Sequence, residues 1–160
     1  MNDRDGPGAA SDSVLMRDAV KRERHALARS ETLVVGIPGE PVAKGRPRFN
    51  GKTGTVYTPT KTRSAEKAIA WEAKRAAAEQ GVTLPLSGPI HLSVSFRTTH
   101  TARGGVNRAS DLDNYVKTVQ DALNGVAYAD DVQVVRIAAD VERYESAVPM
   151  TTIVVRGEAP

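Results

Sequence analysis

The alternation of hydrophobic and polar residues predicts several strands along this chain. The clearest is the stretch in which Ile90, Leu92, Val94 and Phe96 alternate with polar neighbours, a period of two that is typical of a half-buried strand. Shorter segments of strand type lie at 33–37, 55–58, 132–141 and 151–155. We expect 55–58 to return from a hairpin around 51–54, and the last two segments to form an antiparallel pair.

An alanine-rich stretch in the middle of the chain has the composition of a helix. Thr62 or Ser64 is the expected N-cap, and the helix should end near Gln80 because Gly81 supplies a stop signal. Trp71, the single tryptophan, is interpreted as a packing or dimer-interface residue.

A second helix is expected after Ser110. Its apolar positions recur at spacings near i, i+4 and i+7: Leu112, Val116, Val119 and Leu123. Asp113 or Asn114 is the expected N-cap and Gly125 the stop signal. Asp113, Lys117 and Asp121 then share the polar face opposite this apolar stripe.

The order strand, hairpin, helix, strand, helix, strand, strand predicts an α+β fold. We expect a single domain over residues 31–157, with a mixed or mainly antiparallel sheet and two main helices packed on it. A length of 160 residues suits one such compact domain. Residues 1–30 are predicted to form a flexible basic and polar N-terminal extension.

Composition narrows the classes of function. The net charge of +3 permits a nucleic-acid partner without requiring one. The absence of cysteine excludes disulfides, thiolate metal sites and cysteine nucleophiles. No run approaches the roughly 20 apolar residues of a membrane helix, and neither a GxGxxG nor a Walker A pattern indicates a nucleotide cofactor. We therefore expect no membrane partner and a cytoplasmic protein.

Candidate chemistry is concentrated between Ser110 and Val135, in an otherwise basic chain. This segment carries five carboxylates: Asp111, Asp113, Asp121, Asp130 and Asp131. Gathering like charges destabilises a fold unless a cation neutralises them. We hypothesise that the two acidic ends of the segment meet and bind a hard divalent cation, Mg²⁺ or Mn²⁺. Ordinary helix capping, turn formation and surface ion pairs are the alternative explanation.

The same residues, taken in order, also carry a family resemblance. D-x-D-N-x-x-K, D-A-L-N-G and Y-x-D-D-x-Q-V-V are similar to the motifs of the RusA family of Holliday junction resolvases, which are small dimeric Mg²⁺-dependent endonucleases. The resemblance implies Asp111, Asp113 and Asp131 as catalytic metal ligands and Lys117 as the essential lysine. Asp130, Asp121 and Glu66 are assigned as supporting residues behind these ligands. For Glu66 an exposed helix glutamate is the alternative.

Basic residues lie on two loops that could reach phosphate. The first loop, K-G-R-P-R-F, is followed by a glycine turn and Y-T-P, and it too resembles the family's amino-terminal signature. The second is the glycine-rich stretch that leads into Asp111. The expected DNA-binding residues on these loops are Lys44, Arg46, Arg48, Arg103 and Arg108.

The resemblance thus implies a Mg²⁺-dependent endodeoxyribonuclease, with Mn²⁺ as the alternative metal, that resolves Holliday junctions by paired nicks in DNA recombination and repair. We expect a homodimer with four-way or branched DNA as its partner, encoded by a bacterium, phage or prophage. Three alternatives stay open. They are a nuclease of the same fold acting on other branched DNA, a nonenzymatic phage DNA-binding protein, and a protein-interaction module that uses the basic N-terminal segment.

Overall fold

The computed structural model describes residues 14–18, 20–21, 30–46, 48–52, 54–99, 110–143 and 148–160. The chain divides into two units, Met1–Ser30 and Glu31–Pro160. In the first unit, residues 14–18 and 20–21 are helical and exposed.

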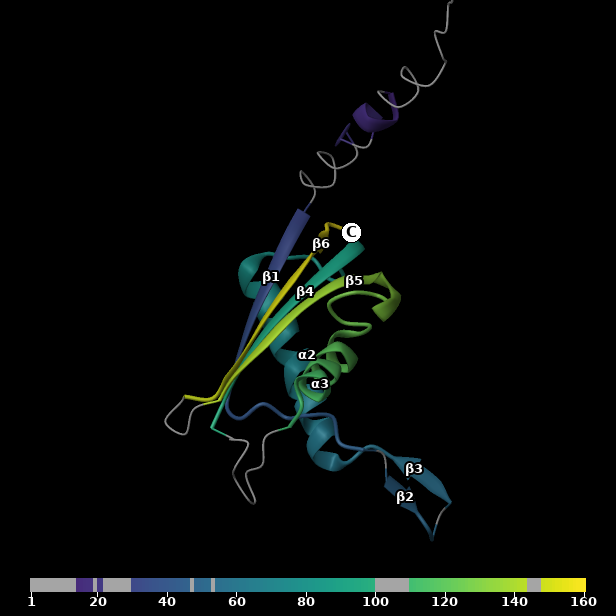
Figure 1. Cartoon of the computed structure of the whole chain (residues 1–160), viewed down its shortest axis with the longest axis vertical. Helices are drawn as coiled ribbons and strands as arrows, with labels where there is room; N and C mark the ends of the chain where they lie inside the picture. The colour runs from purple at the N-terminus through teal and green to yellow at the C-terminus, as the bar shows by residue number, and fades with distance from the viewer. Residues whose placement is uncertain are drawn as a thin grey trace, which may run out of the picture. The chain divides into compact units, whose positions relative to one another are not determined.

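A four-stranded mixed sheet forms the body of the second unit (Figure 1). Its strands, in the order in which they lie side by side, are β1 (Ser30–Pro38), β6 (Met150–Glu158), β4 (Ser87–Thr98) and β5 (Val134–Arg143). β4 is antiparallel to β6 and parallel to β5. The predicted α+β class with a mixed sheet is therefore confirmed.

The expected antiparallel pairing of the last two strands is wrong, because β4 lies between them. Val94 of β4 faces Ala139 of β5 on one side and Ile153 of β6 on the other. The helix between β4 and β5 carries the chain back to the end at which β4 began, so β5 must run parallel to β4. β6 then pairs with the opposite edge of β4.

Two helices cover one face of the sheet (Figure 1). They are α2 (Thr60–Gln80) and α3 (Leu112–Leu123). The inward face of β4 is buried against them at Ile90, Leu92, Val94 and Phe96, as the alternation predicted. The predicted apolar stripe of α3 is also confirmed, since Val116, Val119 and Leu123 are buried and Leu112 packs at the edge of the core.

The helix ends differ from the expected caps. α2 begins at Thr60 behind Pro59, so Thr62 and Ser64 lie inside its first turns. Gly81 does end α2, with a φ of 69° in the left-handed region that favours glycine. Asp111, two residues earlier than predicted, is the N-cap of α3.

The predicted hairpin is present as β2 (Arg48–Asn50) and β3 (Thr55–Tyr57), which pair in antiparallel register. It stands clear of the sheet, next to the N-terminal end of α2 (Figure 1). Trp71 is 61% exposed on α2, with the Arg75 guanidinium 5.9 Å from its ring centroid, so it does not pack into the core of the chain. Among the described residues, no helix has both the length and the hydrophobicity needed to cross a membrane.

Candidate functional site

One pair of candidate metal ligands lies at the start of α3. Asp111 is the N-cap and Asp113 lies in the first turn, and both are exposed. The Asp111 side chain makes no capping hydrogen bond, and neither carboxylate has a hydrogen-bond or ion-pair partner among the described residues. The N-terminal end of a helix is electropositive, which favours these two charged carboxylates. As far as the described residues go, their oxygens are open to a ligand from outside the chain.

Ser110, just before this pair, is tied to the end of β5. Arg143 Nη2 donates a hydrogen bond of 2.8 Å to the Ser110 carbonyl oxygen. Because Arg143 is the last residue of β5, the start of α3 lies at the C-terminal end of that strand.

The second acidic pair lies at the opposite end of β5. Asp131 begins a short 3-10 helix, η1 (Asp131–Gln133), that leads directly into the strand. Asp130 caps this turn: its carboxylate accepts from Val132 N at 2.9 Å, while the Gln133 side chain accepts from Asp130 N at 3.1 Å. Asp130 therefore forms the turn, whereas the exposed Asp131 carboxylate has no partner within the described chain.

The two acidic ends do not meet within one chain. Twelve residues of α3 separate them, which corresponds to about 18 Å of helix. The ten residues of β5 separate them too, because Ser110 adjoins Arg143 and Asp131 precedes Val134. Within the described parts of the chain, no three acidic or histidine side chains cluster closely enough to hold a metal. The hypothesis of convergence within one chain is wrong, because the crossover helix carries the segment from one end of the sheet to the other.

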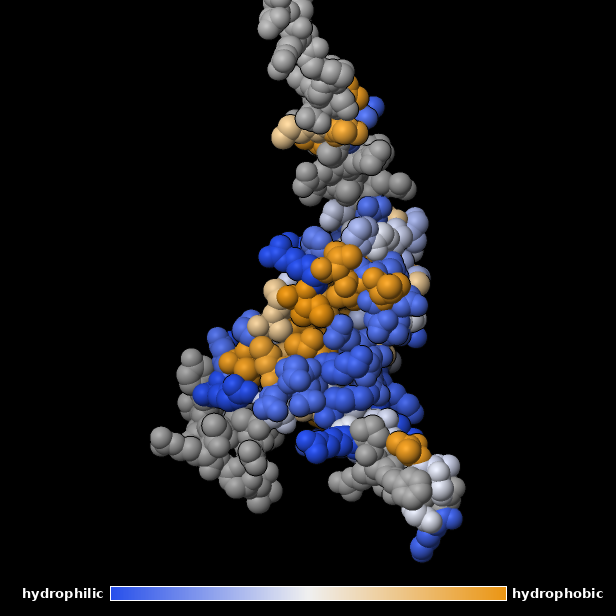
Figure 2. Space-filling model, turned by 45° about the vertical axis from the view of Figure 1, so that its right-hand side comes forward, coloured by the Kyte–Doolittle hydropathy of each residue, from blue (hydrophilic) through white to orange (hydrophobic). Residues whose placement is uncertain are grey.

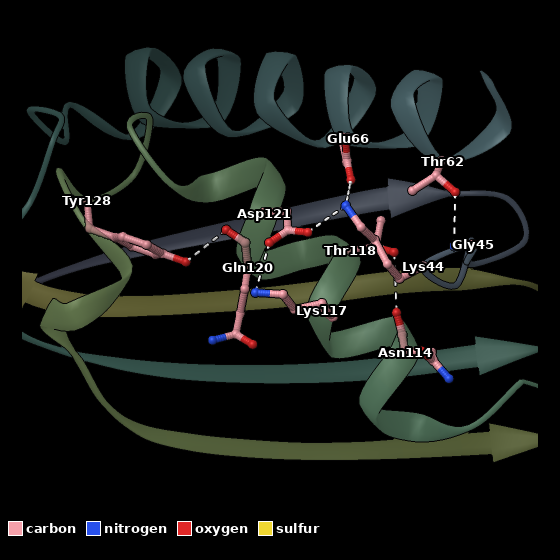
Figure 3. A network of polar contacts seen from close by, with 10 residues as sticks. All are labelled: Lys44, Gly45, Thr62, Glu66, Asn114, Lys117, Thr118, Gln120, Asp121 and Tyr128. Carbon is pink, nitrogen blue, oxygen red and sulfur yellow. Dashed lines mark hydrogen bonds and ion pairs between the residues drawn. The ribbon is translucent and has the colours of Figure 1, made fainter. Parts of the chain in front are cut away.

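Lys117 belongs to a charged network between the two helices (Figure 3). Its Nζ lies 3.0 Å from Asp121 Oδ1, as the i, i+4 spacing predicted. The other oxygen, Asp121 Oδ2, lies 2.6 Å from Lys44 Nζ, and that ammonium also lies 2.6 Å from Glu66 Oε1. Two cations and two carboxylates thus neutralise one another.

The pKa values in this network move in opposite directions. Burial alone would lower the pKa of Lys44, but its hydrogen bonds and attraction to Asp121 and Glu66 outweigh burial and raise that pKa. Burial alone would raise the pKa of Asp121, but hydrogen bonds from Lys44 and Lys117, together with their charges, lower it. Both groups are therefore held in their charged forms at neutral pH.

Tyr128 closes the C-terminal end of α3. Its ring is fully buried and its hydroxyl donates to the Gln120 carbonyl oxygen at 3.2 Å. Burial, helped by the negative charges of Asp131 and Asp121, raises its pKa to about 12. The phenol therefore stays protonated near neutral pH.

A groove of about 610 Å³ runs along α3. Its lining includes Leu112, Asp113, Val116 and Lys117 from the helix and Ala139 from β5. Next to it the edge strand leaves Val135 63% and Ile137 44% exposed. A hydrophobic area crosses the middle of the molecule on the side that carries β5 and α3 (Figure 2). Candidate ligand Asp113 and Lys117 thus lie beside an apolar surface.

The basic residues expected to contact DNA are only partly described. Arg46 is exposed and has no ion-pair partner in the described ranges. Arg48 lies in β2 on the hairpin, and its side chain is outside the described part. Arg103 and Arg108 fall outside the described residues. Lys44 points instead between α2 and α3, into the charged network (Figure 3).

Comparison with known proteins places the chain in a family. Residues 38–156 match the model of a family described as endodeoxyribonuclease RusA. This match spans both acidic ends of α3, Lys117 and the hairpin. The chain belongs to the RusA endodeoxyribonuclease family. As a member of the RusA family, the chain is a nuclease that acts on DNA. The family resemblance of its motifs is confirmed.

A second comparison gives a relative without an assigned activity. The chain is 35% identical over 133 residues to a Bacillus subtilis (strain 168) protein named "Uncharacterized protein YqaN". The similarity covers 75% of this RusA family chain and 92% of that relative.

Sequence reasoning missed how Lys44, Glu66 and Asp121 are joined. The i, i+4 spacing signals only the contact between Lys117 and Asp121. The contacts of Lys44 depend on how α2 packs on α3, which no local pattern in a RusA sequence reveals.

Proposed function

We propose that this chain is a divalent-metal-dependent endodeoxyribonuclease that resolves four-way DNA junctions as a homodimer, in DNA recombination and repair. The observation that carries the proposal is a set of exposed carboxylates, Asp111, Asp113 and Asp131, that have no partner among the described residues of a RusA family chain. Uncompensated carboxylates repel a phosphodiester, so they need a cation before DNA can bind beside them.

A second copy of the chain would complete the ligand set. In a two-fold dimer whose axis passes beside the middle of α3 and perpendicular to it, the two α3 helices run antiparallel. The start of one helix then lies beside the end of the other, so that Asp111 and Asp113 of one copy approach Asp131 of the partner subunit. Each dimer would hold two such sites, as paired nicks on a junction require.

The apolar groove supports this arrangement. Leu112, Val116 and Ala139 line it, and Ile137 and Val135 lie exposed on the edge strand beside it. An exposed apolar patch of this kind marks an interaction surface in a soluble protein. In a two-fold dimer, the patch would be covered by the same residues of the partner subunit.

The donor set fits a hard cation. All three side chains offer carboxylate oxygens, and the chain has no cysteine, which suits Mg²⁺ or Mn²⁺ rather than a thiophilic metal. When bound, the cation would lower the pKa of a coordinated water and neutralise charge on the phosphate.

The remaining roles fall to side chains of the chain itself. Lys117, one turn after Asp113 and 52% exposed, would bring a positive charge to the phosphate as negative charge builds up on it. Arg46, together with Arg48, Arg103 and Arg108, would hold the DNA backbone without reading its sequence. Asp130 would keep Asp131 in position through the turn that it caps.

The test is incubation of the purified protein with a synthetic immobile four-way junction, a flap and a linear duplex, with and without Mg²⁺. We expect Mg²⁺-dependent nicks at symmetric positions on two strands of the junction and little cutting of the duplex. Preferred cutting of the flap would support the alternative of a nuclease for other branched DNA. Binding to all three without cutting in Mg²⁺ or Mn²⁺ would contradict the enzyme and favour a nonenzymatic DNA-binding protein.

A further inference from the structure

Lys44 joins the basic hairpin to the core through two carboxylates from different helices. Its Nζ lies 2.6 Å from Glu66 Oε1 on α2 and 2.6 Å from Asp121 Oδ2 on α3 (Figure 3). The Lys44 side chain is 24% exposed, compared with 52% for Lys117. Its ammonium is therefore paired with two carboxylates of the chain and is less exposed than that of Lys117.

The backbone around Lys44 is fixed as firmly as its side chain. Lys44 N donates to the Asn114 carbonyl oxygen at 2.8 Å, and Gly45 N donates to Thr62 Oγ1 at 3.1 Å. A Cβ at Gly45 would meet Pro59 Cγ at 3.0 Å, so the segment packs directly on the start of α2. The root of the hairpin is thus attached to both helices, one of which carries Asp113 and Lys117.

Asp121 divides its two oxygens between two lysines. Oδ2 faces Lys44 at 2.6 Å and Oδ1 faces Lys117 at 3.0 Å. With Lys44 present, the attraction of Asp121 for Lys117 is weakened, because part of the Asp121 charge is already neutralised. Without Lys44, the carboxylates of Asp121 and Glu66 would have only Lys117 to compensate them.

We infer that Lys44 is a positioning residue that sets how tightly Asp121 holds Lys117, and that it is not itself a phosphate contact. This inference rests on the proposed function, in which Lys117 must leave part of its charge available to DNA. Loss of Lys44 would draw Lys117 toward Asp121 and leave one net negative charge beside the phosphate path. The hairpin would also lose one of its attachments to α3.

A double-mutant cycle separates this role from direct DNA contact. The four proteins are the wild type, Lys44→Met, Asp121→Asn and the double variant. Lys67→Met is the control, because Lys67 is an exposed lysine on the same helix as Glu66 and has no partner among the residues that the structure describes. Junction cleavage is measured under single-turnover conditions in Mg²⁺. We expect Lys44→Met to slow cleavage by about 10-fold in the wild type and by less than about 2-fold in the Asp121→Asn background.

A direct phosphate contact predicts a different result. Lys44→Met would then slow cleavage by the same factor in the wild-type and Asp121→Asn backgrounds. The slope of log affinity against log salt for junction binding in Ca²⁺ would fall by about one unit. Either observation would overturn the inference. An unchanged salt slope together with the loss of the Lys44→Met effect in the double variant would support it.

A second readout does not depend on cleavage. The reactivity of the Lys117 amine toward N-hydroxysuccinimidyl acetate is followed by mass spectrometry. Lys44→Met should slow acetylation of Lys117, the double variant should reverse that change, and Lys44→Arg, which keeps the charge, should stay close to the wild type. If Lys117 reacts equally in the wild type and in Lys44→Met, the inference is wrong even if the protein cuts junctions. If the reactivity changes as expected but no DNA is cut, the proposed function fails and the coupling of Lys44 to Lys117 through Asp121 stands.

Discussion

Two groups of carboxylates in this molecule differ in how their negative charge is compensated. Glu66 and Asp121 are partly buried between α2 and α3, and each faces Lys44 at 2.6 Å. Asp111, Asp113 and Asp131 are exposed, and no partner faces them among the described residues. The first group is neutralised by the fold and so fixes geometry, whereas the second has no compensating cation among the described residues. The difference separates side chains that build the site from those that would bind a cation and, through it, DNA.

The largest expected effect comes from removing one unpartnered carboxylate. Asp113→Asn keeps the shape of the side chain but removes the charge that would hold the cation, so junction cleavage in Mg²⁺ should fall by about 100-fold or more. Binding to the same junction in Ca²⁺ should be retained or improved, because repulsion of phosphate is reduced. Asp140→Asn is the control, since Asp140 is exposed on β5 and accepts a hydrogen bond from Ser95 Oγ at 2.8 Å. Equal cleavage by the two variants would remove Asp113 from the site.

A smaller effect is expected when a charge is placed on the exposed apolar strand beside the groove. Ile137→Asp should weaken self-association by about 10-fold or more, because the carboxylate would be buried without a partner in the dimer. Sedimentation over a range of protein concentrations measures this change, and cleavage should fall in parallel. Val148→Asp, which alters another exposed apolar residue away from the groove, should change neither. A dimer unaffected by Ile137→Asp would use another surface.

Removal of one basic residue just before the hairpin should have a smaller effect on junction binding. Arg46→Ala should weaken junction binding in Ca²⁺ several-fold and reduce the slope of log affinity against log salt by about one unit, as expected for one lost phosphate contact. Arg156→Ala, an exposed arginine on β6, is the comparison. The assignment of Arg46 to the DNA surface would be contradicted if both variants had the slope of the wild type.

The smallest effect concerns the neutralised group and pH. The pKa of Asp121 is lowered in the folded protein, so its stabilising contribution is present above its ordinary pKa of 3.8 and is lost as the pH falls through the lowered value. The pKa of Lys44 is raised, so its contribution is present below 10.5 and is lost as the pH rises through the raised value. Between these limits the network stabilises the fold. Urea unfolding at about pH 6 and about pH 3 should show a smaller acid-induced loss in Asp121→Asn than in the wild type. An equal loss in both would mean that the ion pairs contribute nothing to stability.

Local patterns predicted the elements of this fold but not how they are joined. The alternation at Ile90 to Phe96 and the apolar stripe from Val116 to Leu123 identified β4 and α3, because each pattern directly reflects one buried face. The order of strands was not predicted, because the alternation of residues in β6 would be the same whether β6 paired with β4 or with β5. The contact between Lys44 and Asp121 was missed because it joins residues far apart in the chain and depends on helix packing.

The candidate site was predicted as a set of residues and not as a geometry. The ordered motif identified Asp111, Asp113, Lys117 and Asp131, because a motif of residue types can be recognised without knowing the fold. Their separation along α3 is a consequence of the parallel crossover between β4 and β5, which local sequence patterns do not reveal.

The central claim, that each site is shared between two copies, is tested most directly by mixing two inactive variants. Asp113→Asn and Asp131→Asn are purified separately, mixed so that subunits exchange, and assayed on a four-way junction in Mg²⁺. In each mixed dimer one shared site lacks both carboxylates and the other is intact, so random exchange should restore about a quarter of the wild-type sites. Cleavage in the mixture at that level is the result we predict. A mixture that exchanges subunits and stays as inactive as either variant alone would contradict the account.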